Sequence, residues 1–141
     1  MFLTNHTLTG AALAINIENP LILAPAALAS HFVLDSIPHF GHPGADWHKW
    51  KWQVVAFTDS LLSLSAYLAL IAIFPHLLWQ ITLGVFLATF PDLLYIPRHF
   101  WKKYYFKRMQ KFHKAIQHES QAGGIVEGLW LLAIIQLINA K

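Results

Sequence analysis

The strongest constraint on the fold is an apolar run at residues 54–74, VVAFTDSLLSLSAYLALIAIF, in which Asp59 is the only charged residue. A helix needs about 20 apolar residues to cross the hydrocarbon core of a bilayer, and this run has that length. Residues 77–96 form a second apolar run after a short turn at Pro75 and His76. Because lipid cannot hydrate backbone polar groups, we expect the two runs to form an antiparallel helical hairpin across a membrane.

The rest of the chain is also apolar. Hydrophobic residues make up 56% of its 141 residues and charged residues only 12%, against about 25% charged residues in an ordinary soluble domain. Residues 124–140 form a third apolar segment, and the first forty residues indicate a helical hairpin with its turn at Glu18 and Asn19. We therefore predict a single membrane-embedded domain over residues 1–141, an all-α polytopic bundle of about five helices.

The basic residues indicate how this bundle is oriented. If each segment crosses once, nine of the ten Lys and Arg residues lie at one end and only Lys141 lies at the other, so the positive-inside rule makes the basic end cytoplasmic. Residues 98–114, RHFWKKYYFKRMQKFHK, alternate aromatic and basic residues in a way that is typical of an amphipathic helix in the membrane interface. We expect anionic membrane lipid, and not nucleic acid, to be the partner of this segment.

Histidine and aspartate side chains are predicted to gather at the same end. His31 and Asp35 are four residues apart, so on a helix they share a face and one metal ion could touch both. A carboxylate at the end of an apolar helix is costly unless it is paired, hydrated or bound to a metal. The same end receives five further candidate metal ligands, namely His6, His39, Asp92, His113 and His118. With no cysteine in the chain, this set of ligands suits one or two divalent ions, Zn or alternatively Mn or Fe.

Three further acids, Asp59, Glu119 and Glu127, could accept a proton from a water molecule that a metal activates. Simpler interpretations stay open for several of these residues. Asp59 could hydrogen bond to Ser or Thr hydroxyls inside the bundle, and Glu127 could support a metal ligand. His113 and His118 are five residues apart, so they diverge on a regular helix and meet one metal only if the helix breaks between them.

Short motifs resemble a known family. They are NHTLTGAALA near the start, SHFVLD at 30–35, PD at 91–92 and HKAIQHES at 113–120. In these motifs the chain resembles the bacterial membrane-bound metal-dependent hydrolases of the domain-of-unknown-function 457 group, which implies an inner-membrane location. The HxxxD pattern of HFVLDSIPH is also similar to zinc phospholipase C and nuclease sites. The chain departs from the family pattern at Leu94 and Tyr95, which replace a second acid, and at Ala115 and Gln117.

The predicted function is metal-assisted hydrolysis at the cytoplasmic face, with phosphoesters or other lipid-linked molecules as substrates. The alternative is a non-catalytic membrane protein that binds or transports a metal ion. Against a carrier, the half of each predicted span opposite the site is almost purely apolar. A third possibility is a helical scaffold whose interfacial histidines are hydrated and bind no metal.

Overall fold

The structure is a computed structural model, and it describes residues 1–41, 49–94 and 106–140. Its elements, in chain order, are α1 (Leu3–Asn16), α2 (Pro20–Ser36), β1 (His39–Phe40), α3 (Trp50–Ile73), the 3-10 helix η1 (Pro75–Leu77), α4 (Leu78–Leu93), α6 (Lys107–Ile116), β2 (Glu119–Ser120) and α7 (Gly123–Asn139). The predicted all-α class is confirmed, since the two strands contain only two residues each.

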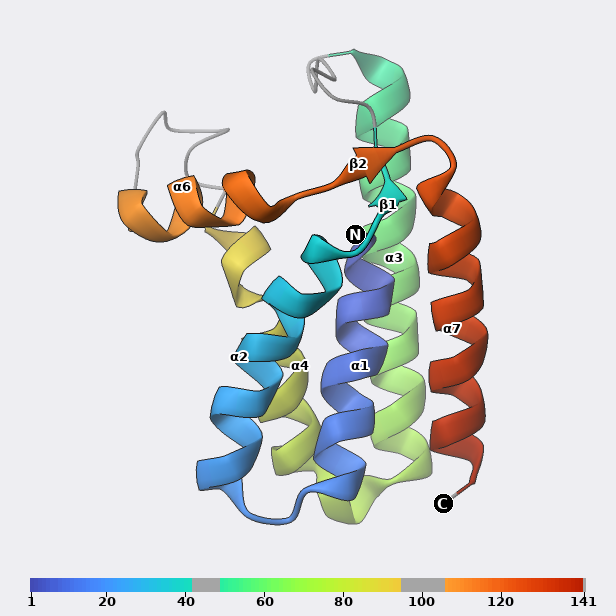
Figure 1. The fold of residues 1–141 in the computed structure, drawn as a ribbon. Helices are drawn as coiled ribbons and strands as arrows, with labels where there is room; N and C mark the ends of the chain where they lie inside the picture. Colours follow the sequence, from blue (N-terminus) through green and yellow to red (C-terminus); the bar gives the residue numbers. More distant parts are fainter. Residues whose placement is uncertain (42–48, 95–105, 141) are drawn as a thin grey trace.

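Helix α1 lies at the centre of the bundle, with α2, α3, α4 and α7 around it (Figure 1). Every residue from Asn5 to Ala12 is buried, and several of them are polar. Buried polar groups need partners, and α1 finds them on its neighbours. The hydroxyls of Thr7 and Ser63, for example, share a hydrogen bond of 2.6 Å between α1 and α3.

The predicted turn between the first two helices is confirmed. Helix α1 ends at Asn16, and α2 begins at Pro20, whose missing backbone N–H is not needed at the first position of a helix. The side chain of Asn19 caps α2 by accepting a hydrogen bond of 2.9 Å from the backbone N–H of Leu21. The helix continues through Pro25 and ends at Ser36, just before Pro38.

Helices α1 and α4 cross at Gly10 and Gly84. A Cβ atom at Gly10 would lie 2.5 Å from the carbonyl oxygen of Gly84, and one at Gly84 would clash with the carbonyl of Gly10. Ala14 and Ala88 follow four residues after each glycine, so each helix presents a small-xxx-small pattern at the contact. Such patterns let helix backbones approach closely, and here they bring the end of α4 next to α1 and α2.

Of the predicted membrane-crossing helices, the structure supports one. Among the described helices, α3 alone is long and apolar enough to cross a membrane. Only two of its 24 residues, Ser63 and Leu70, are buried, so α3 is mostly exposed and is not a buried core helix of this bundle. Helices α2 and α7 have 17 residues each and α4 has 16, or about 25 Å at 1.5 Å per residue. They are shorter than the roughly 20 residues that a crossing helix needs, so the predicted polytopic bundle is not confirmed by helix length.

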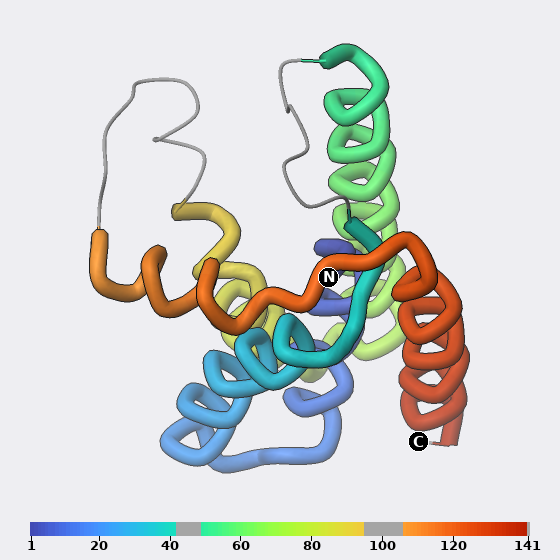
Figure 2. Tube along the Cα trace, turned by 45° about the horizontal axis from the view of Figure 1, so that its top comes forward, coloured from blue at the N-terminus to red at the C-terminus, as the bar shows by residue number. Residues whose placement is uncertain are grey.

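The segments that were predicted to meet at one end of the bundle do so. The start of α1, the end of α2, the start of α3 and the end of α4 lie at the same end, and α6 lies across it (Figure 1). From α6, the chain runs over this end to α7, pairing β2 with β1 in parallel on the way (Figure 2). The described basic residues are exposed at this end, namely Lys49, Lys51, Lys107, Arg108, Lys111 and Lys114. Residues 98–105 of the predicted basic segment lie outside the described residues.

The close contact between α1 and α4 can be tested with one added methyl group. Gly84→Ala should lower the melting temperature in detergent, because the methyl group meets the carbonyl of Gly10 and overpacking of this kind costs about 1–3 kcal/mol. Gly128→Ala is the matched control, since nothing lies within 4 Å of its new Cβ in α7. Alanine also favours a helix by about 1 kcal/mol over glycine, so the control should melt at the same temperature or higher. Equal melting temperatures for the two variants would contradict the crossing described above.

Candidate metal centre

Four side chains from three helices point to one place at the basic end. His31 and Asp35 come from α2, Asp92 from α4 and His113 from α6. Each offers one nitrogen or oxygen atom, and these four atoms all lie within 4.8 Å of one another. The group can therefore hold a metal ion, as the sequence predicted for these four residues.

Local structure explains how His31 is oriented. It lies one helical turn before Asp35, so both side chains face α1 and α4. Its Nδ1 lies 2.7 Å from the carbonyl oxygen of Ala88 and must donate, because a carbonyl can only accept. The proton on Nδ1 leaves the lone pair on Nε2, which faces the other three side chains. A backbone carbonyl that fixes the tautomer in this way is typical of histidine ligands to metals.

The distances from His31 to two of the other ligand atoms are close to the edge of a coordination tetrahedron. Ligand atoms bound to zinc at about 2.0–2.2 Å lie about 3.3 Å apart. His31 Nε2 is 3.1 Å from His113 Nε2, 3.3 Å from Asp35 Oδ2 and 3.8 Å from Asp92 Oδ1. His113 Nε2 is 3.8 Å from Asp92 Oδ1 and contacts Asp35 Oδ2 directly. The two distances to Asp92 are longer than this edge and the contact between His113 and Asp35 is shorter, so these side chains would have to shift slightly to bind one ion through two nitrogen and two oxygen atoms.

Asp35 has its second oxygen occupied elsewhere. Its Oδ1 accepts hydrogen bonds from Nε2 of His6 at 3.2 Å and from the amino group of Met1 at 2.7 Å. These contacts orient the carboxylate so that Oδ2 faces His31 and His113. The other ring nitrogen of His6, Nδ1, is buried and makes no hydrogen bond within the described part of the chain.

Burial raises the free-energy cost of keeping the carboxylates of this group charged. His31 and Asp35 are 0% exposed and His113 is 1% exposed, whereas the side chain of Asp92 is 32% exposed. Two carboxylates so close together repel each other and lose hydration, and a divalent cation offsets both costs. Asp92 is the most exposed of the four ligands, so water reaches the group from its side.

The three other predicted ligands lie outside the group of four. His6 contacts Asp35 but stacks beside His31 at 4.2 Å between ring centroids. His39 is buried in β1, where its Nδ1–H donates to the carbonyl of Ile37. His118 is exposed, and its Nδ1–H donates to the carbonyl of Ile116. Helix α6 ends at Ile116, so the break expected between His113 and His118 is present, but it does not turn His118 toward the metal group.

Two of the three predicted proton acceptors hold the start of α1. Asp59 accepts hydrogen bonds from the backbone N–H groups of Leu3 and Thr4, at 2.6 and 3.1 Å, and from the hydroxyl of Thr4. Glu127 accepts from the backbone of Phe2 and from Asn5, both at 2.9 Å. Its other oxygen accepts from the backbone of Phe40. Carboxylates at a helix N-terminus satisfy its free N–H groups and complement its dipole.

Glu119, the third predicted acceptor, lies in β2, opposite His39 in the parallel pair. Its side chain lies against Gly41, where a Cβ atom would come within 2.7 Å of the glutamate Cγ. No contact described for Glu119 joins it to the group of four. The described contacts of Glu119 therefore give no support to its predicted role as a proton acceptor.

The sequence analysis missed one polar neighbour of the site. Nε2 of Gln117 lies 3.3 Å from Nε2 of His113. The two residues are four apart, the spacing that brings side chains together on a helix, and this was the signal that could have found it. A second missed contact, the carbonyl of Ala88, carries no signal in the sequence because it depends on how α4 packs against α2.

Comparisons of the chain with protein-family models, curated proteins and solved structures gave no match. The metal centre therefore rests on the geometry and chemistry of its own residues. The resemblance to the domain-of-unknown-function 457 group stays a prediction.

The group of four predicts which histidines control metal content. Purified protein without a histidine tag should retain about one divalent ion per chain, and His31→Ala or Asp35→Asn should weaken metal affinity by at least ~10-fold, because each removes a ligand. His118→Ala is the matched control, since the side chain of this exposed histidine contacts the carbonyl of Ile116, and its hydrogen bond to Asp35 comes from the backbone, which the substitution keeps. Metal analysis after equilibrium dialysis measures the difference. Equal metal content in all three variants would contradict the assignment.

Proposed function

We propose that this chain is a membrane-embedded, metal-dependent hydrolase whose ion, zinc in our first choice, is held by His31, Asp35, Asp92 and His113. The observation that carries the proposal is the grouping of these four ligand atoms, all within 4.8 Å of one another, at one polar end of an otherwise apolar bundle. Such an ion supplies Lewis acidity, which activates water and polarises a phosphoryl or carbonyl group. Histidine and carboxylate ligands without sulfur suit Zn, and also Mn or Fe.

Each protein group has a role in this proposal. His31 and His113 fix the ion at the buried side, and the carbonyl of Ala88 keeps His31 in the tautomer that can bind it. Asp35 joins these two histidines, with its other oxygen held by His6. Asp92 is the partly exposed ligand, so substrate and water would approach the ion from its side. We also assign to Asp92 the role of the nearest proton acceptor for that water.

The apolar exterior supports embedding of the whole bundle in lipid. Large hydrophobic side chains are exposed along α3 and also on α2, α4 and α7, for example Leu21, Phe57, Trp79 and Leu129, each more than 60% exposed. Soluble proteins rarely expose contiguous apolar surface on this scale. We therefore propose a polytopic protein in which α2, α4 and α7 also lie in the bilayer, with local thinning around the shorter helices. The basic end then faces the cytoplasm.

Orientation can be tested with single cysteines, because the chain has none of its own. Lys51→Cys and Lys111→Cys are exposed at the metal end, and His76→Cys is exposed at the opposite end. In sealed inner-membrane vesicles, a membrane-impermeant maleimide should label the first two from the same side and His76→Cys only from the other side. Labelling of Lys51→Cys and Lys111→Cys from opposite sides would contradict the proposed topology.

The charges around the site favour an anionic substrate. Helix α6 places His113 in the metal group while Lys107, Arg108 and Lys111 are exposed on the same helix. Phe112 is also exposed there, at 53%, so the helix offers both cations and an apolar side chain to a membrane surface. Cations near the interface attract anionic lipid headgroups and raise their local concentration. We therefore propose a lipid phosphoester as the first substrate class, and another lipid-linked ester or amide as the second.

The resemblance to the domain-of-unknown-function 457 group agrees with this proposal. The HxxxD motif supplies His31 and Asp35, the PD pair supplies Asp92, and the last motif supplies His113. Its final histidine, His118, is not part of the group of four. The family resemblance adds the expectation of a bacterial inner membrane.

Hydrolysis is tested with purified protein in vesicles that contain phosphatidylglycerol. Release of phosphate or a phosphorylated headgroup should stop when a chelator removes the ion, and Asp92→Asn should lower the rate about 100-fold or more, because it removes the exposed ligand and proton acceptor. His118→Ala should keep its activity. Chelator-sensitive release of fatty acid would replace the phosphoester by an acyl ester. Protein that holds its metal but turns over no lipid would contradict a hydrolase.

One observation favours a second candidate, a non-catalytic metal-binding membrane protein. Four protein ligands complete a tetrahedron, and zinc sites of this closed kind are usually structural, whereas catalytic sites keep one position for water. In that case metal removal should lower the melting temperature while no lipid is hydrolysed. The partial exposure of Asp92 is what places the hydrolase first.

A further inference from the structure

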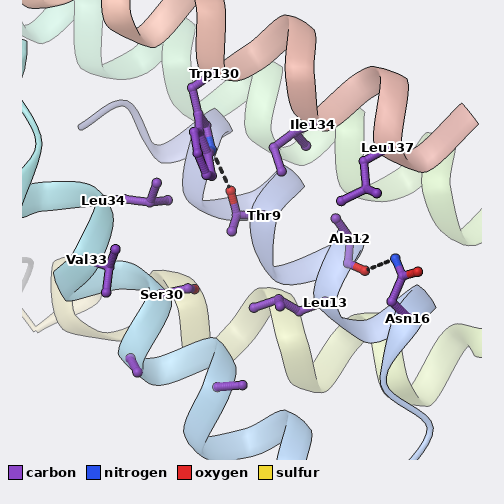
Figure 3. Close-up of a pocket in the computed structure, with 12 residues that line it drawn as sticks. Thr9, Ala12, Leu13, Asn16, Ser30, Val33, Leu34, Trp130, Ile134 and Leu137 are labelled. Carbon is purple, nitrogen blue, oxygen red and sulfur yellow. Dashed lines mark hydrogen bonds between the residues drawn. The ribbon is translucent and has the colours of Figure 1, made fainter.

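An apolar groove runs along the outside of the bundle between α2 and α7, with α1 as its floor. Its volume is about 440 Å³, which is within the range of small-molecule sites. Figure 3 shows Trp130, Ile134 and Leu137 of α7 on one side and Val33 and Leu34 of α2 on the other. The groove is open toward the medium that surrounds the bundle, since Val33 is 59% and Leu137 is 49% exposed.

The polar side chains that line the groove are satisfied within the protein. The indole N–H of Trp130 donates to the hydroxyl of Thr9 at 3.0 Å (Figure 3). The hydroxyl of Ser30 donates to a backbone carbonyl of α2 at 2.8 Å, and the amide of Asn16 donates to one of α1 at 2.8 Å. With these donors used internally, the wall that remains is hydrocarbon. Such a wall suits an apolar occupant and gives a polar ligand little to hold it.

The length of the groove matches one leaflet of a membrane. Along α1 it extends from Thr9 to Asn16, along α2 from Ala26 to Leu34, and along α7 from Trp130 to Leu137. Each stretch is about 12 Å long at 1.5 Å per residue. Half of a hydrocarbon core of about 30 Å is about 15 Å. An extended acyl chain in one leaflet therefore has the length to fill the groove.

One end of the groove lies close to the metal centre. Leu34 directly precedes Asp35, Ser30 directly precedes His31, and Thr9 is one helical turn after His6. An acyl chain in the groove would thus have its polar end at the level of the metal group and of the cations on α6. The small side chains of Ala12 and Ala26 leave room for a hydrocarbon chain in the slot between the helices.

We propose that this groove binds one acyl chain of a membrane lipid whose headgroup lies at the metal end of the bundle. The inference rests on the membrane location in the proposed function, and it specifies the substrate as a lipid held by its hydrocarbon tail. The groove then selects molecules with a long acyl chain, while the metal centre and α6 act on the headgroup.

The test uses phosphatidylglycerol that carries a photoactivatable diazirine in one acyl chain, in vesicles of phosphatidylethanolamine and phosphatidylglycerol. After illumination, mass spectrometry should find labelled residues concentrated on the groove walls of α2 and α7, above the level on the outer face of α3. Ala29→Phe should lower this labelling several-fold, because Ala29 is an exposed residue that lines the groove. Ala133→Phe is the matched control, since Ala133 is exposed on α7 and does not line the groove.

Two outcomes would overturn the inference. One is equal labelling of the groove and of the outer face of α3 in the unmodified protein, a comparison that does not depend on how any variant folds. The other is crosslinking of the groove to a second copy of the chain in place of lipid. Metal content is measured on the same samples. If the protein holds metal but the groove is not labelled, only the groove proposal is contradicted. If the groove is labelled but the protein binds no metal, only the hydrolase proposal is contradicted.

Discussion

The buried carboxylate of Asp35 is the interaction on which the polar end of this structure depends. One oxygen binds the start of α1 through His6, and the other faces His31 of its own helix and His113 of α6. A carboxylate that is fully removed from water carries a large cost, and only several well-placed partners can offset it. Here the partners come from three helices, so satisfying one charge fixes how those helices meet. The same arrangement brings four candidate metal ligands into one group.

Two further carboxylates extend this principle to the rest of the bundle. Asp59 of α3 and Glu127 of α7 both accept hydrogen bonds from the first backbone N–H groups of α1. A helix N-terminus leaves backbone N–H donors without partners inside the helix, and here the two acids satisfy them. The central helix is thus anchored at its polar end by charge, while its middle is held by the close crossing of Gly10 and Gly84.

Concentrating the polar groups at one end leaves the remaining surface to hydrocarbon. The exposed faces of α2, α3, α4 and α7 are apolar, and the groove between α2 and α7 has its polar side chains paired internally. In our proposal a lipid would therefore meet the protein in two ways, with its tail along the apolar groove and its headgroup beside the metal centre and the cations of α6. The separation of a charged end from an apolar body would thus account both for binding of the lipid tail and for reaction at the headgroup.

The sequence by itself determined the helical class, the turn at Asn19, the gathering of charge at one end and the pairing of His31 with Asp35. These features depend on the local chain, that is, on hydrophobic run length, capping and the i, i+4 spacing of a helix. The tertiary structure decided the rest. It selected His113 over His118, and it assigned Asp59 and Glu127 to the start of α1 rather than to the metal group. These choices depend on where α6 lies across the bundle and how closely α1 and α4 approach, and a side chain's direction relative to another helix is set by that packing and not by its spacing along the chain.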